Sequence, residues 1–499
     1  MGAACGLALG AAGAATARAE TLTDAIALAY QTNPTLQAER AQLRATDEVY
    51  VQARAGYRPT ANVQASGQFQ WETLGSRVGC TVFSCPAIDQ SANANQFSAQ
   101  LQLTQPLYTG GRTTAQVRGA EAQVLAERER LRQTEGSVLL GVIQAYVDVR
   151  RDQQSLAIRK ENVGVLQRQV DETRARFDAG EVTRTDVAQS EAQLAASQSE
   201  LSTAQAQLAI SRSAYAAAVG QSPGDLAPEP PFGTFPATVE QAFDTAEANN
   251  PAIGQADYQE QSAAADLAAA KAQRMPQVSA SGGFGYSQPV TPWDAALGAR
   301  AFTAGVTLSQ PLFSGGMVSS QIRQAVERQN IARIQIEQAR RNAVQTISDS
   351  WNQLLAARAS ITANEEAVRA ATVAFDGTRA EQEAGLRTTL EVLSAQQVLR
   401  DAQLALVNAR ADEYVASASV LNVMGLLQVR TLAPELEIEP GGHSLGQLKH
   451  AFGYTPLEEP VSALDAVGAP EVRRRPEPLD GPIAVNPQPP AAVSTPGAP

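Results

Sequence analysis

The sequence predicts an α+β membrane protein built from two structural repeats, in which pairs of β-strands alternate with long helices. Three observations predict this fold. Segments of alternating apolar and polar residues occur in two pairs, and a long proline-free run follows each pair. A similar motif marks each transition, TQPLYTGGR at Thr104–Arg112 and SQPLFSGGM at Ser309–Met317. The recurrence of the whole pattern indicates a duplicated architecture.

The composition excludes some classes of protein. Aromatic residues make up only 5% of the 499 residues, which is poor material for a large globular core but suits long, closely packed helices. The formal net charge is −12, and this acidic balance argues against nucleic acid as a partner.

The first residues have the features of a secretory signal. A stretch of small and apolar residues ends in Ala17-Arg18-Ala19 before Glu20, which resembles a signal-peptidase site. We therefore expect residues 1–19 to be a signal peptide, although a basic n-region is missing. No later window of about 18 apolar residues predicts a membrane-spanning helix. Membrane strands would leave a weaker trace in the sequence.

Two offsets define the internal repeat. Asn33-Pro34 matches Asn250-Pro251 at an offset of 217, whereas Pro106 matches Pro311 at 205. The difference, 217 − 205 = 12 residues, places one insertion in the first copy. We assign residues 20–220 to repeat 1, 221–236 to a linker rich in turn formers and 237–430 to repeat 2. The insertion belongs to one loop, which contains Cys80 and Cys85. A small disulfide-closed loop is expected there.

The alternating segments predict two β-hairpins, at residues 59–105 and 276–310. In the first, the residues at odd positions from Ala61 to Trp71 are apolar or small and lie on one face, and the uncharged polar residues at even positions lie on the other. A soluble half-buried sheet would show a similar period. The uncharged polar face, the segment length and the aromatic residues near the loops favour membrane strands.

Four such strands cannot close a barrel, and an open sheet edge is not tolerated in lipid. The chain must then assemble with copies of itself. Two copies would give eight strands and a barrel largely filled by side chains, whereas three copies would give twelve strands and an aqueous lumen.

The proline-free runs predict pairs of helices in each repeat: a long helix at 112–178 followed by one at 183–219, and one at 317–383 followed by one at 388–428. A helix of 67 residues is about 100 Å long, which indicates a coiled coil or a helical tube. Large and small residues alternate along the second helix of each pair at heptad spacing, as in Leu194 and Ser197, and this pattern suits close helix pairing.

Each helix pair has a predicted tight turn. Gly180 and Gly385 stand where a C-terminal glycine cap is expected, and Thr183 and Thr388 stand at the start of the next helix. These turns would form the ends of the helical hairpins that lie farthest from the strands.

Taken together, the Asn-Pro pairs, the two junctions and the AGxxTxxD/E turns resemble the TolC-type outer membrane factors, from about Thr21 to Gln428. The opening stretch ETLTDAIALAYQTNPTLQAERAQLRA looks most like the branch that serves type I protein secretion. The resemblance implies a homotrimer in the outer membrane, with a twelve-stranded barrel that continues into a periplasmic α-helical tunnel. The junctions (Pro106, Gly110, Gly111, Pro311, Gly315 and Gly316) would connect barrel and tunnel.

The resemblance also implies partners and a gate. A periplasmic adaptor would contact the hairpin turns, and an inner-membrane ABC transporter, or an RND pump, would deliver the cargo. Arg387 matches a gate arginine, with Thr185 and Asp186 as its partners, and Glu391 matches an acidic residue that rings the entrance. Drug efflux is the alternative function to protein secretion.

No motif in the sequence indicates an enzyme, a metal site or a cofactor. The two histidines, His443 and His450, lie beyond the repeats, and no zinc spacing, phosphate loop or nucleophile elbow occurs. A periplasmic adaptor or a coiled-coil structural protein is a remote alternative, since an adaptor would carry a single helical hairpin. Residues 431–499 form a C-terminal tail that we expect to be largely disordered from about residue 470, because proline is abundant there.

Overall fold

The computed structural model describes residues 19–78, 87–233, 235–289, 298–433, 435, 442–451 and 455–469, and for residues 71–78 and 87–95 it describes the backbone alone. Within these residues the chain forms two compact units. The first unit is drawn from Met1–Glu48, Val124–Gln255 and Ala339–Leu445, and the second from Val49–Gln123, Ala256–Gln338 and Gly446–Pro499. The expected signal peptide up to residue 18, the expected disulfide between Cys80 and Cys85, and the tail from residue 470 lie outside the described residues.

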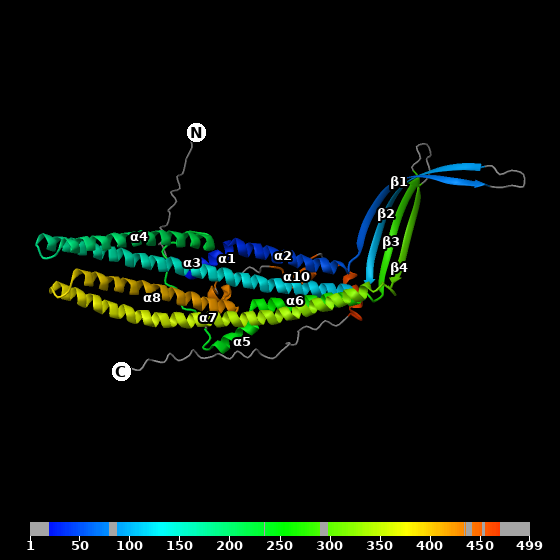
Figure 1. Ribbon diagram of the computed structural model, residues 1–499. Coiled ribbons are helices and arrows are strands. Elements are labelled where there is room, and N and C mark those ends of the chain that lie inside the picture. Colours follow the sequence, from blue (N-terminus) through cyan, green and yellow to red (C-terminus); the bar gives the residue numbers. More distant parts are fainter. Residues whose placement is uncertain are drawn as a thin grey trace, which may run out of the picture. The chain divides into compact units, whose positions relative to one another are not determined.

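The elements follow the predicted order, two helices, two strands and two long helices in each repeat (Figure 1). In repeat 1 they are α1 (Leu22–Thr32), α2 (Pro34–Ala55), β1 (Thr60–Val78), β2 (Ala87–Tyr108), α3 (Arg112–Asp178) and α4 (Arg184–Val219). In repeat 2 they are α5 (Val239–Asn249), α6 (Pro251–Ala272), β3 (Gln277–Pro289), β4 (Ala299–Ser309), α7 (Met317–Glu383) and α8 (Thr389–Val423). Three short helices follow, α9 (Val429–Leu432), α10 (Leu445–Lys449) and α11 (Glu458–Ala466).

The strands form one antiparallel sheet in the order β1-β2-β3-β4 (Figure 1). The register places Val63 opposite Leu101, Leu101 opposite Phe284 and Phe284 opposite Phe302, so one apolar row crosses all four strands. On the other face Ser66 pairs with Ser98, and their hydroxyl oxygens lie 2.8 Å apart. The sheet therefore has the predicted apolar face and polar face. The large apolar side chains of that row are 47 to 77% exposed, so this chain does not cover them.

The first unit contains the hairpins α3/α4 and α7/α8 (Figure 1). Its core gathers around Tyr146 and Tyr215, both fully buried, with Leu139 and Ile143 from α3 and Ile26 from α1. Along α4 the small heptad residues Ser190, Ser197, Ala204 and Ser211 are buried. The predicted close pairing of α3 and α4 therefore rests on small side chains, which let two helix backbones approach.

The asparagine of the Asn-Pro pair has the same structural role in both repeats. Asn33 joins α1 to α2, accepting from the backbone of Thr35 at 2.9 Å and donating to the carbonyl oxygen of Ala218 near the end of α4. Asn250 joins α5 to α6 and donates to the carbonyl oxygen of Val423, the last residue of α8, at 2.7 Å. The acceptors are 205 residues apart, which is the offset of the helical part of the repeat.

Two features differ from the sequence-based prediction. The second helix of repeat 2 was expected to reach residue 428, but α8 ends at Val423 because Gly425 has φ = 71°, outside the helical region. Pro106 was expected at the junction, but it lies inside β2, where a bulge between Pro106 and Tyr108 accommodates it. The tail is expected to be largely disordered from about residue 470, and before that residue the structure describes two short helices, α10 and α11.

None of the helices among these residues combines the length and the apolar character that a bilayer-spanning helix needs.

Candidate functional site at the hairpin tips and the strand-to-helix junctions

Both hairpin tips in the first unit use the same local structure. At the end of α3, Gly180 has φ = 81°, and the backbone N–H of Glu181 donates to the carbonyl oxygen of Arg176 at 2.9 Å. At the end of α7, Gly385 has φ = 78°, and the N–H of Leu386 donates to the carbonyl oxygen of Glu381 at 2.8 Å. These bonds define Schellman motifs, which satisfy the last carbonyl groups of each long helix.

Capping boxes start the returning helices. Thr183 caps α4 and Thr388 caps α8, and in each case the threonine hydroxyl and the acidic residue three positions later bond reciprocally. Hydrogen bonds from Thr183 hold the pKa of Asp186 below its usual value. The backbone N–H of Thr388, and then the guanidinium of Arg387, lower the pKa of Glu391 to about 2. Two predicted gate residues are therefore also helix caps.

Arg387 lies in the second tip between two acidic residues. Its Nε donates to Glu381 at 2.8 Å and its Nη1 to Glu391 at 2.7 Å, and all three side chains are roughly half exposed. The sequence analysis missed Glu381, six residues upstream, because nothing in the linear sequence shows that the turn brings the two side chains together.

The structure does not bring Arg387 to Thr185 or Asp186 within the chain. Among the described residues, Arg387 bonds only to Glu381 and Glu391 through Nε and Nη1, and its Nη2 has no hydrogen bond. Asp186 uses Oδ2 for both bonds to Thr183 and has no bond at Oδ1 in the same residue set. Nη2 of Arg387 and Oδ1 of Asp186 could therefore form a hydrogen bond with each other without breaking any bond that the two side chains already make.

A buried polar network ties the second hairpin to the first. Gln396 of α8 donates to Oδ1 of Asn162 of α3 at 2.9 Å, and Asn162 donates to the hydroxyl of Ser197 of α4 at 2.8 Å. One helical turn along, Glu200 accepts from Arg400 of α8 and from Arg159 of α3, each at 2.9 Å. A buried polar group that loses its partner is costly, so these contacts fix the register of α8 on the first hairpin.

In the second unit, a glycine pair turns the chain from strand to helix at each junction. Gly110 and Gly111 have φ of 69° and 81°, and Gly315 and Gly316 have φ of 61° and 85°. Two successive left-handed residues are strongly disfavoured for any residue with a side chain. At Gly110 a Cβ would also lie 2.3 Å from the Cβ of Met275. The predicted role of these four glycines as turn residues fits their backbone conformation.

A carboxylate from α11 completes the first junction. Oδ1 of Asp465 accepts from the backbone N–H and hydroxyl of Thr109, at 2.7 and 2.8 Å, and from the N–H of Gly111 at 3.1 Å. Oδ2 accepts from the N–H and hydroxyl of Thr114, at 3.1 and 2.9 Å. Burial alone would raise the pKa of Asp465, but the bonds from Thr109, Gly111 and Thr114 outweigh it and lower that pKa. Asp465 thus caps the N-terminus of α3.

The other end of α11 is held by a second buried carboxylate. Glu458 accepts from the guanidinium groups of Arg54, at the end of α2, and Arg58, the latter at 2.9 Å. Burial raises the pKa of Glu458, but the bonds from Thr455 and both arginines outweigh that effect and lower it. Sequence reasoning missed both carboxylates, because an acidic residue in a proline-rich tail is expected to be solvated.

The second junction carries no comparable cover among the described residues. Leu312 and Phe313 are 92 and 91% exposed, whereas their repeat-1 counterparts Leu107 and Tyr108 are half-buried. The two junctions therefore share a backbone conformation but differ in what packs on them.

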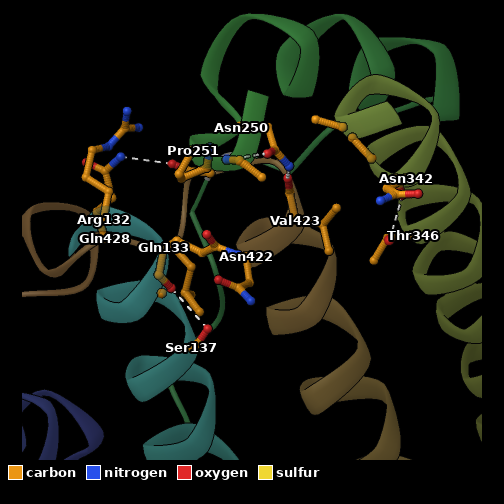
Figure 2. Close-up of a pocket in the computed structure, with 16 residues that line it drawn as sticks. Arg132, Gln133, Ser137, Asn250, Pro251, Asn342, Thr346, Asn422, Val423 and Gln428 are labelled. Atoms are coloured by element: carbon orange, nitrogen blue, oxygen red, sulfur yellow. Dashed lines mark hydrogen bonds between the residues drawn. The ribbon is translucent and has the colours of Figure 1, made fainter. Parts of the chain in front are cut away.

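A cavity of about 350 Å³ lies where α8 ends in the first unit (Figure 2). Amide side chains line it, including Asn250, Asn342, Asn422 and Gln428. Arg132, the one charged side chain among the described lining residues, bonds to Glu129 at 2.6 Å. Gly425 lines the same cavity and leaves room for the carbonyl oxygen of Asn249, which would lie 2.3 Å from a Cβ. Within the described ranges, no group of three or more His, Cys, Asp or Glu side chains is placed to hold a metal ion.

Comparison with known proteins places these features in a family. The family model described as "Outer membrane efflux protein" matches residues 25–221 and 242–426. The chain is 36% identical over 426 residues to the outer membrane efflux protein BepC of Brucella suis biovar 1 (strain 1330), covering 84% of this chain and 90% of BepC.

Two further relatives and one solved structure agree with that match. Identity to the outer membrane protein TolC of Escherichia coli (strain K12) is 27%, covering 68% of this chain and 71% of TolC. Identity to the alkaline protease secretion protein AprF of Pseudomonas aeruginosa is 25%, and the match covers 67% of this chain and 70% of AprF. A crystal structure of a membrane protein from Pseudomonas aeruginosa has a similar fold, with a TM-score of 0.70 and 21% identity over 81% of this chain and 93% of that one.

Proposed function

Because the chain belongs to the outer membrane efflux protein family, we propose that it is the exit duct of a tripartite type I protein secretion system. The family consists of outer-membrane channels rather than enzymes, so the chain is a channel protein of the outer membrane with its helical part in the periplasm. The proposal adds the partners, an inner-membrane ABC transporter and a periplasmic adaptor, and the cargo.

The proposal is based on one observation: both repeats connect a pair of strands to a helical hairpin through the same kind of junction. Each repeat supplies two strands with one apolar face, a glycine-pair junction and a helical hairpin. The outer strands β1 and β4 have no partner on their free edges in the described sheet. Since lipid does not tolerate such edges, three copies with four strands each would close a twelve-stranded barrel. Cross-linking of detergent-extracted protein should then give a trimer, and a stable monomer would contradict this assembly.

The gate is proposed at the tips. Arg387 has Nη2 unused and Asp186 has Oδ1 unused in the described residues, so a contact between adjacent hairpins can add to the bonds within each tip. Thr185, beside Asp186, offers a hydroxyl acceptor. Three symmetric copies of this contact would hold the entrance closed until the adaptor binds the turns at Gly180, Thr183, Gly385 and Thr388.

Single-channel recording in planar bilayers tests the gate. Arg387→Ala should raise the conductance of the trimer, because the contact between hairpins is lost. Arg379→Ala is the matched control, since it removes an exposed arginine whose ion-pair partner, Glu383, lies on the same helix. If both variants conduct like the wild type while the trimer persists, Arg387 is a solvated rim charge and the gate is wrong.

The entrance charge has a separate test. Glu391→Gln keeps a residue that supports a capping box but removes the negative charge, so cation preference should fall without loss of the tip structure. An unchanged ion selectivity would show that Glu391 acts only as a cap.

The cargo is proposed from the resemblance of residues 20–45 to the secretion branch, and the relative named for alkaline protease secretion supports it. Small-molecule efflux is the second candidate, and the higher identity to a relative named as an efflux protein favours it. Deleting the protein in its host discriminates the two. Loss of a secreted polypeptide with unchanged drug susceptibility supports secretion, whereas the reverse result supports efflux.

A further inference from the structure

The helix α11 presents three different sides. One side is buried and carries Glu458, Val461 and Asp465, spaced i, i+3 and i+7. An apolar, exposed stripe consists of Leu464 of the helix, 50% exposed, and the two cap residues, Leu457 at 49% and Val467 at 67%. The third side carries Glu459, Ala463 and Ala466, all exposed. An apolar stripe that faces outward beside a buried pair of carboxylates is the reverse of an ordinary surface helix.

The two ends of α11 attach to neighbouring strands at the same end of the sheet. Glu458 binds Arg58, two residues before β1 begins at Thr60. Asp465 binds Thr109, directly after β2 ends at Tyr108. Because β1 and β2 pair side by side, the nine-residue helix lies across the strand ends where the helices of the second unit begin.

The contact with Tyr108 shows which face of the sheet α11 adjoins. The bulge in β2 places Tyr108 opposite Val278. Val278 belongs to the apolar face, because it lies at even spacing from Phe284 on β3. The hydroxyl of Tyr108 donates to the carbonyl oxygen of Val467 at 3.3 Å. The C-terminal end of α11 therefore adjoins the apolar face, not the polar one.

We propose that α11 is an interfacial helix that binds the phospholipid surface of the periplasmic leaflet through the stripe Leu457, Leu464 and Val467. In an outer-membrane protein the apolar face of the sheet contacts lipid, and the end of the sheet next to the helices is its periplasmic boundary. A helix lying across that boundary, on the lipid side, is placed where apolar side chains enter the acyl region while the polar side stays in water.

The second junction supports a lipid surface at this level. Leu312 and Phe313, the repeat-2 counterparts of Leu107 and Tyr108, lie at the same end of the sheet and are almost fully exposed. In repeat 1 the stripe of α11 supplies apolar surface instead. A second copy of the chain would meet this sheet at the edges of β1 and β4. Glu458 holds the N-terminal end of α11 next to the edge strand β1, whereas Asp465 and Tyr108 hold its C-terminal end at β2, an inner strand.

The buried carboxylates orient the stripe. Glu458 and Asp465 are 5 and 1% exposed. Glu458 bonds to Arg54 of α2 and to Arg58, and Asp465 bonds to the junction residues Thr109 and Gly111 and to Thr114 of α3. They fasten one side of the helix to protein, so that the charged side cannot turn toward lipid and the apolar side cannot turn toward water.

Fluorescence quenching in nanodiscs tests this inference with the full-length protein. In a background with Cys5, Cys80 and Cys85 replaced by serine, an environment-sensitive dye is attached at Leu464→Cys or, as the matched control, at Glu459→Cys. The discs contain phosphatidylcholine with or without bromine on its acyl chains. The dye at position 464 should lose most of its fluorescence in brominated discs, and the dye at position 459 should not.

Two further results decide the matter. Adding Asp465→Ala to the Leu464→Cys protein should reduce quenching at 464, because the C-terminal end of α11 then loses all of its side-chain bonds to Thr109, Gly111 and Thr114. Equal quenching at both positions, or none at 464, overturns the inference. A disulfide between Leu464→Cys and Phe313→Cys of separate copies overturns it in favour of a contact between copies. Single-channel conductance of the same labelled preparations verifies folding and reports on the channel function independently.

Discussion

Replacing Asp465 with asparagine should loosen the start of α3 by an amount that the hydrogen bonds define. An asparagine side chain can take two orientations, and the one that preserves more hydrogen bonds keeps Oδ1 next to the two donors of Thr109 and the N–H of Gly111. The amide nitrogen then replaces Oδ2, so the backbone N–H of Thr114 loses its acceptor. Leaving a buried donor unsatisfied costs about 1–3 kcal/mol, and losing a negative charge at a helix N-terminus costs about 0.3–1 kcal/mol more, or ~2 kcal/mol where partly buried.

The expected sum is about 1.3–5 kcal/mol of local opening free energy, which corresponds to about 8- to 4,000-fold faster amide exchange at a tenfold change per 1.4 kcal/mol. Hydrogen-exchange mass spectrometry on the peptide that contains Thr109, Gly111 and Thr114 measures this directly. Glu459→Gln is the matched control, because that side chain is exposed on the same helix. If Asp465→Asn leaves the exchange of this peptide at the wild-type rate, the carboxylate does not stabilise the junction and the reasoning fails.

Three other outcomes are expected. Gly425→Ala should lower the melting temperature of the assembly, because alanine costs about 1–2 kcal/mol at φ = 71° and meets a backbone oxygen, whereas Gly377→Ala, in an open helical position, should raise it slightly. The pKa of Glu391 is depressed to about 2, so its contribution to tip stability is complete above its unfolded value of 4.5 and is lost as pH falls toward 2. Amide exchange at the second tip, corrected for intrinsic rates, should therefore accelerate only in that window, and unchanged protection at pH 2 would refute the capping role. A double-mutant cycle with Asn162→Ala and Gln396→Ala should show a coupling of about 0.5–3 kcal/mol in thermal or denaturant unfolding, and purely additive effects would contradict the network.

Much of the fold could be predicted from local pattern alone. The alternation from Ala61 onward predicts a two-faced strand, and the register confirms it across four strands. The glycine pairs at 110–111 and 315–316 predict a turn after β2 and after β4. This could be read from the sequence because a left-handed backbone depends on the glycine itself and needs no partner elsewhere in the chain. Likewise Thr183 and Thr388 mark helix starts through bonds to residues three positions away. Interactions that close within a few residues are visible in a linear sequence.

Long-range polar contacts could not be predicted in the same way. Nothing near Asp465 or Glu458 in the sequence indicates that either carboxylate is buried, because the residues of the strand-to-helix region that bind them lie hundreds of residues upstream. Pro106 shows the same limit for strands, since only the bulge in β2 and its partner β3 explain how a proline fits inside the sheet. The gate residues remain a prediction, because one chain cannot show contacts that adjacent hairpins would make.

The position of Asp465 also orders the events of biogenesis. The junction that it caps belongs to the first repeat, and the bond to Thr109 spans 356 residues, while the bond from Arg54 to Glu458 spans 404. Export delivers the N-terminal repeat first, so the first sheet-to-helix junction stays uncapped until residue 465 has arrived. A chain truncated after repeat 2 would contain every strand and every long helix that the structure describes and would still lack this cap. The delivery of α11 is therefore a condition for completing the first junction.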